Sequence, residues 1–431
     1  MTKKLTYFIY FISICLFSQN ESLNKYSDFT TFTLSLGKTP SSNPGFPDTN
    51  FYKSISLNFG KTNLDNDNEW VHRLKHPNTG ISFELSDFGN PEYLGYSLSI
   101  IPFIEFGLFK KYTNRLSMLL GMGGSYFTYN YKDIPYAYNN FPENNSRGVS
   151  TKFTWAFKFS LSYDIIRKEN ATWKIGTGFF HQSNGHTNLP NNGYNSILVS
   201  LSRQSYYNEQ TPTIIEDNFI KKVYKKNSQY YFDLRLGLGV NVLSETINKR
   251  NRVYTIAPSF GKILNKTFKI GVGFYYRYYE NYYNYIVNEG ELVVEDTPHF
   301  MDNPFKYATN YGVFITSELL LGHIGVEATL GYNIYKPFYE TDWRLTEGFY
   351  WEVNNSDGSS ENLYIYGEKD EYNKAKKAIS TRFGLRYYLF SNEKAPINNY
   401  YIGANINANL GQADFTELSI GYIHCFEYKE K

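Results

Sequence analysis

The stretch FTWAFKFSLSY, residues 153–163, alternates large apolar residues with small or polar ones at every second position. A period of two is typical of a β-strand whose two faces meet different surroundings. The stretch YYFDLRLGLGV, residues 230–240, repeats the pattern, with leucines on one face and Asp233 and Arg235 on the other. We therefore expect apolar faces toward lipid and polar faces toward a barrel lumen.

Comparable segments recur along nearly the whole chain. They begin near Phe29, Tyr52, Gly80, Leu94, Arg115, Trp173, Ile197, Arg252, Phe268, Tyr311, Gly322, Arg382, Tyr400 and Phe415. In lipid every backbone hydrogen-bonding group must be paired within the protein, which a closed barrel achieves and an open sheet does not. The sequence therefore predicts an all-β fold, a single closed antiparallel transmembrane β-barrel of about 12–16 strands. Long polar stretches at 131–149, 208–228, 288–309 and 338–380 are interpreted as loops.

The composition agrees with a protein embedded in a membrane. Aromatic residues make up 19% of the chain, including 42 Tyr and 34 Phe, which is more tyrosine than a soluble core usually holds. In membrane barrels such residues form girdles at the bilayer boundaries. After the N-terminal segment no apolar run reaches the ~18 residues of a membrane helix. The net charge of +2, with no basic patch, indicates that nucleic acid is not a partner.

The N-terminus has the pattern of an export signal. A basic start is followed by an apolar stretch at 5–17 that is too short to span a bilayer. We expect a signal peptide over residues 1–18 and one barrel domain with long loops over 19–431. Cys425 is the only cysteine after the signal, so no disulfide is expected.

One hairpin carries the residues best suited to chemistry. It runs WKIGTGFFHQSNGHTNLPNNGYN over residues 173–195. Strand parity places His181 and Ser183 on the same face as the apolar residues of the first strand, and Asn195 on the apolar face of the returning strand. We therefore expect all three side chains on the outer wall near the hairpin tip, where they can bond to one another.

These three residue types, placed together, favour acyl transfer. A serine hydroxyl becomes a nucleophile when an imidazole takes its proton, and a third group must orient that imidazole. Ser183, His181 and Asn195 supply the three roles, and the turn at Asn184 and Gly185 offers backbone N–H groups to an oxyanion. The alternative is that they are polar strand-end residues at the head-group boundary, and the short His-x-Ser pattern does not decide between the two.

The hairpin resembles two families of outer-membrane enzymes. The run HQSNG at 181–185, with Asn195 fourteen residues after the histidine, resembles outer membrane phospholipase A, which has a His-Ser-Asn triad on its barrel exterior. The same region, with the turn PNNG at 190–193, is similar to the PagL-type lipid A 3-O-deacylases and acyloxyacyl hydrolases. Those deacylases have Glu as the third member, where this chain has Asn195. The stretch FGNPEYLG at 88–95 is also similar to large deacylase-type barrels, and the resemblance covers about residues 80–205.

The resemblance implies a serine esterase in the outer membrane of a Gram-negative cell. Ser183 would be the nucleophile, His181 the general base and then acid, and Asn195 the orienting group. The amide of Gly185 would help to bind the oxyanion.

The resemblance does not carry a metal site to this chain. The phospholipase's calcium-binding arginine and serine fall on His186 and Asn191 here. We therefore expect no metal and no cofactor, with calcium left open.

The substrate depends on topology. If the N-terminus is periplasmic and the strand beginning at Trp173 is the seventh, the loop 184–194 is extracellular and the site meets the leaflet that holds lipopolysaccharide. That favours lipid A, whereas the opposite topology favours a phospholipid. A non-enzymatic channel or adhesin is the alternative class, because charged lumen positions suit a pore. The acyl chain that is cut and a homodimeric state stay open.

Overall fold

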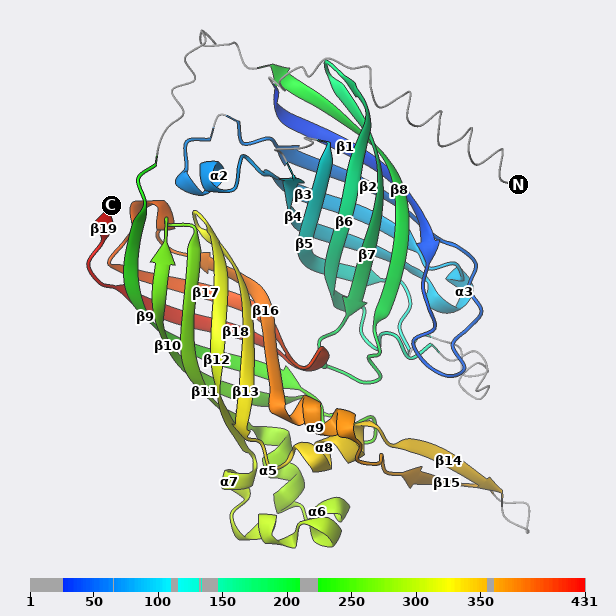
Figure 1. The fold of residues 1–431 in the computed structure, drawn as a ribbon. Helices are drawn as coiled ribbons and strands as arrows, with labels where there is room; N and C mark the ends of the chain where they lie inside the picture. The colour runs from blue at the N-terminus through cyan, green and yellow to red at the C-terminus, as the bar shows by residue number, and fades with distance from the viewer. Residues whose placement is uncertain are drawn as a thin grey trace. The chain divides into compact units, whose positions relative to one another are not determined.

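The computed structural model describes residues 26–64, 66–109, 115–131, 133, 146–209, 224–354 and 360–430. They form two compact units, each of which contains a closed barrel (Figure 1). The expected signal peptide lies outside the described residues. Within the described part of the chain, no helix is both long and apolar enough to cross a bilayer.

The first barrel consists of eight antiparallel strands, each paired with its neighbour in sequence. The strands are β1 (Tyr26–Lys38), β2 (Tyr52–Lys61), β3 (Asn78–Asp87), β4 (Tyr96–Leu108), β5 (Leu116–Phe127), β6 (Phe153–Lys168), β7 (Ala171–Ser183) and β8 (Tyr194–Glu209). The ring closes where β1 pairs with β8, which places Leu34 opposite Leu201. Along the chain, α2 (Glu69–Arg73) follows β2 and α3 (Pro91–Leu94) follows β3.

The second barrel closes in the same way, because β9 pairs with both β18 and β10. Its strands are β9 (Asn227–Asn241), β10 (Asn251–Leu264), β11 (Phe268–Tyr279), β12 (Thr309–Leu321), β13 (Ile324–Tyr335), β16 (Ile379–Tyr388), β17 (Asn398–Asn409) and β18 (Gln412–Cys425). The short β19 (Lys429–Glu430) adds to β9, and β14 (Phe349–Asn354) pairs with β15 (Ser360–Ile365) in a separate hairpin.

Helices gather at one end of the second barrel (Figure 1). They are α5 (Glu280–Val287), α6 (Glu291–Asp296), η2 (Pro298–Asp302) and α7 (Pro304–Tyr307) after β11, then α8 (Tyr339–Thr346) and α9 (Glu371–Ala378) after β13; η3 (Asn392–Lys394) follows β16. Tyr282 and Ile286 of α5 are buried together with Phe338 and Phe415. This shared apolar cluster attaches the helices to the barrel strands.

The predicted all-β fold of closed antiparallel strands is confirmed, but the strands close as two barrels rather than one. The predicted loop 208–228 separates them along the chain, since β8 ends at Glu209 and β9 begins at Asn227. Alternation shows only that each strand has one apolar and one polar face. Which strand closes the ring is decided by long-range pairing that no local pattern reports.

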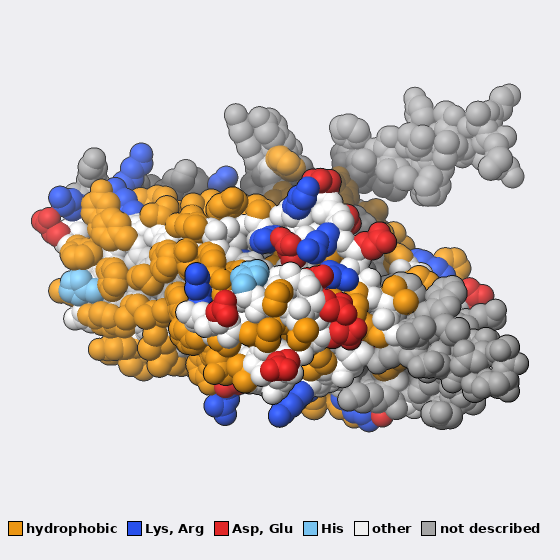
Figure 2. Space-filling view, turned by 90° about the horizontal axis from the view of Figure 1, so that it is seen from below, with side chains coloured by type: hydrophobic (Ala, Val, Ile, Leu, Met, Phe, Trp, Pro, Cys, Tyr) orange, Lys and Arg blue, Asp and Glu red, His pale blue; other side chains and the backbone are white. Residues whose placement is uncertain are grey.

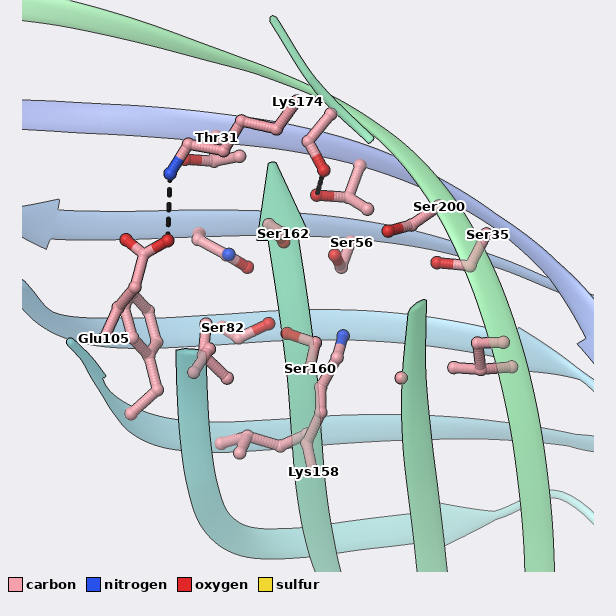
Figure 3. A pocket seen from close by; sticks show the side chains of 18 of the residues that line it. Thr31, Ser35, Ser56, Ser82, Glu105, Lys158, Ser160, Ser162, Lys174 and Ser200 are labelled. Atoms are coloured by element: carbon pink, nitrogen blue, oxygen red, sulfur yellow. Dashed lines mark hydrogen bonds and ion pairs between the residues drawn. The ribbon is translucent and has the colours of Figure 1, made fainter. Parts of the chain in front are cut away.

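The barrel walls are apolar outside and polar inside. Leu34, Ile55 and Leu236 are among many exposed apolar residues on the strands, and Figure 2 shows a broad field of such side chains on one face of the molecule. Inside the first barrel, a cavity is lined by serines and by Lys174, whose Nζ lies 2.9 Å from Glu105 Oε1 (Figure 3).

The lumen of the second barrel holds an ion-pair network. Its members are Asp233, Arg235, Lys269, Glu318, Glu327, Arg382, Arg386 and Glu417. Lys269 Nζ lies 2.8 Å from Asp233 and 3.1 Å from Glu318. Asp233 and Arg235 therefore point into the lumen as expected, but they are paired rather than lining an open pore. Pairing offsets the large cost of removing these charges from water.

Candidate functional site

The hairpin of β7 and β8 carries the predicted site residues, and β7 is the seventh strand. In the β-ladder His181 lies directly opposite Asn195, while Phe157 lies opposite His181 on the other side. His181 Nδ1 is 2.7 Å from Asn195 Oδ1. Because the amide oxygen only accepts, Nδ1 carries the hydrogen and donates it. The other ring nitrogen, Nε2, is then the atom able to take a proton.

Ser183 follows on the same face and pairs across the ladder with Trp155. A Cβ added to Gly193 would lie 2.9 Å from His181 Cε1 and 3.4 Å from Ser183 Cβ, so the two side chains border the same small space. No hydrogen bond between described residues joins Ser183 Oγ to the imidazole. Catalytic hydrogen bonds are often long before substrate binds and shorten in the complex.

This face of the hairpin points outward. On the same parity as the site residues, Phe179 is 41% exposed and Ile197 is 60% exposed. The alternate residue Gln182 is buried, and its Nε2 donates to Ser125 Oγ at 2.7 Å inside the barrel. The structure therefore pairs His181 with Asn195 on the outer wall at the hairpin end, and Ser183, whose side chain is buried, follows two residues later on the same strand face.

An aromatic cluster supports the hairpin from the lumen side. Phe180 and Tyr194, the inward neighbours of the site residues, are buried with Phe88 and Phe127. The rings of Phe88 and Phe127 stack at 5.5 Å, and Phe88 lies 4.8 Å from Tyr194. Close packing of this kind holds both strands in register, so the outer residues keep their positions.

The expected oxyanion turn consists of Asn184 and Gly185. Asn184 belongs to the first unit, where its Nδ2 donates to Ser150 Oγ at 3.2 Å. Gly185 begins the segment 185–191, which belongs to the second unit, and has a φ of +64° that favours glycine. His186 follows in that segment; its Nε2 lies 3.0 Å from the carbonyl oxygen of Val242, and burial lowers its pKa.

The described residues contain no group of three or more His, Cys, Asp or Glu side chains able to hold a metal ion. The two positions that correspond to the phospholipase's calcium site, His186 and Asn191, both lie in the segment 185–191.

Sequence reasoning missed two contributions to the site. Gly193, with a φ of +73°, leaves room for the imidazole and the serine at the point where the chain turns back. Phe157 flanks the imidazole, with ring centroids 6.1 Å apart. The alternation of 153–163 together with the strand order would have identified Phe157, whereas nothing in the sequence reports the close approach at Gly193.

A second cross-strand His–Asn pair lies in the other barrel. His424 is opposite Asn398 in the ladder, and its Nδ1 lies 2.9 Å from Asn398 Oδ1. The residues two positions to either side of this histidine are Tyr422 and Phe426, so no serine takes the place that Ser183 has beside His181. The pair is therefore a natural control for the first one.

A comparison with protein families finds a match for part of the chain. Residues 56–204 match the family model for lipid A 3-O-deacylase (PagL). No curated protein sequence matches the chain.

Among solved structures, CdiB from Acinetobacter baumannii is 10% identical, with 94% of this chain and 61% of that chain covered and a TM-score of 0.16. This chain thus spans less than two thirds of the length of CdiB. A bacterial polysaccharide outer membrane secretin is 8% identical, with 94% and 100% covered and a TM-score of 0.17. The NanC porin is 9% identical, with 78% and 97% covered and a TM-score of 0.15.

The matched segment begins in β2, ends in β8 and contains His181, Ser183 and Asn195. The chain is an outer-membrane β-barrel protein, and residues 56–204, which lie within its first barrel, are similar to the lipid A 3-O-deacylase (PagL) family.

Proposed function

We propose that the first barrel is a serine esterase in the outer membrane of a Gram-negative cell and that it removes an acyl chain from lipid A. The observation that carries the proposal is the bond between His181 Nδ1 and Asn195 Oδ1 on the outer wall, two residues from Ser183. An imidazole held in this way beside a hydroxyl is the arrangement that nucleophilic catalysis requires.

In the proposed reaction Ser183 Oγ attacks the ester carbonyl carbon while His181 Nε2 takes the hydroxyl proton. Backbone N–H groups of Asn184 and Gly185 stabilise the oxyanion. His181 then gives its proton to the departing lipid alkoxide, which leaves an acyl-serine. A water molecule, deprotonated by His181, attacks this ester, and the fatty acid leaves as Ser183 recovers its proton.

The surroundings of the site suit an ester at the edge of the hydrocarbon layer. Phe157, Phe179 and Ile197 give the outer wall an apolar surface along which an acyl chain can lie. The site itself is at the end of β7 and thus near the head groups. With a periplasmic N-terminus, the seventh strand ends in the outer leaflet, which supports lipid A over a phospholipid.

A channel finds no support in the described residues. The buried aromatic cluster around Phe180 lies on the lumen side of the first barrel, and paired charges around Lys269 occupy the lumen of the second. The amide at Asn195 leaves phospholipid as the competing substrate, because the resembling phospholipases also have asparagine there.

The test uses the full chain, purified in detergent and incubated separately with lipopolysaccharide and with phospholipid. Mass spectrometry of both lipid classes should show lipid A that has lost one acyl chain, and Ser183→Ala should slow this by at least about 10³-fold. His424→Ala is the matched control and should retain full activity. Fatty acid released only from phospholipid would assign the other substrate, and unchanged release by Ser183→Ala would reject the triad.

A further inference from the structure

Both arms of the candidate-site hairpin are held near its tip by the segment 146–150, which belongs to the connection between β5 and β6. On the returning arm, Asn192 N donates to Arg147 O at 3.1 Å. The next residue, Gly193, donates from its N–H to Gly148 O at 2.8 Å. These two consecutive backbone hydrogen bonds fix the returning arm at the glycine that borders the imidazole and the serine of the site.

The segment is itself fixed by the first barrel. Val149 is buried in the aromatic cluster on the lumen side of the hairpin, together with Phe127 and Tyr194. Ser146 Oγ lies 2.7 Å from Tyr194 Oη, and a Cβ added to Gly148 would lie 2.1 Å from the ring of the same tyrosine. Close packing of this kind leaves the segment little room to move, so it can serve as a rigid support for the hairpin tip.

On the outgoing arm, the segment contacts the residue that follows the candidate nucleophile. Asn184 Nδ2 donates to Ser150 Oγ at 3.2 Å, and the two residues are only 3% and 4% exposed. A buried amide that loses a hydrogen-bond partner is unfavourable, because water cannot reach it to replace that partner. The side chain of Asn184 is therefore held against the barrel at this point.

The backbone of Asn184 determines the geometry of the expected oxyanion hole. Its own N–H and the N–H of Gly185 lie on successive peptide planes, and each plane is rigid. The angle between the two donors therefore depends on φ and ψ of Asn184. Because the side chain branches from the same Cα atom, holding it against Ser150 restricts both rotations.

We propose that Ser150 is a positioning residue that aims the backbone N–H groups of Asn184 and Gly185 at the oxyanion. The proposal rests on the proposed esterase function, in which Ser183 attacks the ester, and Ser150 acts only through Asn184. The negative charge that the two donors stabilise develops on the carbonyl oxygen in the transition state. A loss of their alignment should therefore lower kcat and leave KM nearly unchanged.

The experiment measures kcat and KM for release of fatty acid from lipid A by the full chain in mixed micelles. Ser150→Ala removes the acceptor and should lower kcat by about tenfold, which is less than the roughly 10²- to 10³-fold loss when an oxyanion donor itself is removed. KM should stay within about twofold of the wild type. Ser150→Cys keeps the size of the side chain but is a weaker acceptor, so it should show an intermediate loss, and it repeats the test if Ser150→Ala does not fold.

A double-mutant cycle with Asn184→Ala separates positioning from a general structural effect. Asn184→Ala keeps the backbone N–H groups and removes the side chain that donates the 3.2 Å bond. If the two side chains act through one bond, the double variant should be no slower than the slower single variant. Losses that multiply in the double variant would overturn the proposal.

Ser125→Ala is the matched control. Ser125 Oγ also accepts from a buried amide, Gln182 Nε2, at 2.7 Å, and Gln182 keeps Ser97 Oγ as a second partner at 3.0 Å. The kcat of this control should equal that of the wild type. An equal loss in Ser125→Ala, a wild-type kcat in both Ser150 variants, or a rise in KM without a change in kcat would overturn the role of Ser150. A wild type that releases no fatty acid would refute the proposed esterase, and this inference with it.

Discussion

The hydrogen bond between His181 and Asn195 offers the most direct test of the proposed chemistry. Asn195→Ala removes the acceptor that lies 2.7 Å from Nδ1 and leaves both His181 and Ser183 in place. The imidazole then loses its fixed orientation, and the tautomer with hydrogen on Nε2, which cannot take the serine proton, becomes populated. The variant should therefore lose rate while keeping its barrel.

The expected size follows from the energy of one hydrogen bond. A bond of this kind contributes about 0.5–1.5 kcal/mol net, and about 1.36 kcal/mol in the barrier is tenfold in rate. The lost orientation of the imidazole alone should thus lower the rate by roughly twofold to tenfold, and the competing tautomer should lower it further. We expect kcat/KM for Asn195→Ala to fall by about ten- to a hundredfold. Asn195→Asp should keep the bond and add a charge that stabilises the imidazolium, so its activity should match or exceed the wild type.

The assay is release of fatty acid from lipid A in mixed micelles, with kcat and KM measured separately. Asn398→Ala is the matched control, since Asn398 accepts from His424 in the same cross-strand geometry on the other barrel. Wild-type kcat/KM in Asn195→Ala would refute the reasoning, and so would an equal loss in Asn398→Ala.

Three further outcomes follow from the structure. Gly193→Ala should lower kcat more than it raises KM in the same assay, because the new Cβ would lie 2.9 Å from His181 Cε1 at a φ of +73°; wild-type kinetics would contradict this. Lys269→Met should destabilise the second barrel by about 3–5 kcal/mol in thermal or urea unfolding, because buried carboxylates lose their partner, while the exposed Lys374→Met should change little. Burial raises the pKa of Asp342 in α8 to about 7, so the folded state binds more protons than the unfolded state, and stability should fall as pH rises from about 4 toward 7. In Asp342→Asn the free energy of unfolding, measured as a function of pH, should fall less steeply over this range. An unchanged slope would contradict the role given to Asp342.

The alternation of apolar and polar residues predicts the strands and the strand face on which each side chain lies. The alternation at 153–163 and 230–240 gave β6 and β9, and parity correctly placed Asp233 and Arg235 in a lumen. It also put His181 and Asn195 on one wall, since residues facing each other across a hairpin follow from its turn.

What the sequence did not predict depends on contacts between distant strands. Because β1 pairs with β8, the strands form two small barrels instead of the single large barrel that we expect from the sequence. The period-two pattern does not predict this pairing. From the sequence, the lumen charges are compatible with a pore, because strand parity predicts which way a side chain points but not which residue it pairs with. Lys269 meets Asp233 and Glu318 only after β9, β11 and β12 lie side by side.

The side chains inside the two barrels have a kinetic consequence. Buried aromatic residues lie on the lumen side of one barrel and paired charges occupy the lumen of the other, so we expect a lipid to meet the described strands at the outer wall. A lipid must then arrive sideways, by diffusing in two dimensions within its own leaflet. The reaction should follow the mole fraction of substrate at the surface rather than its bulk molarity, so inert detergent added at constant total lipid would slow it by dilution in the plane.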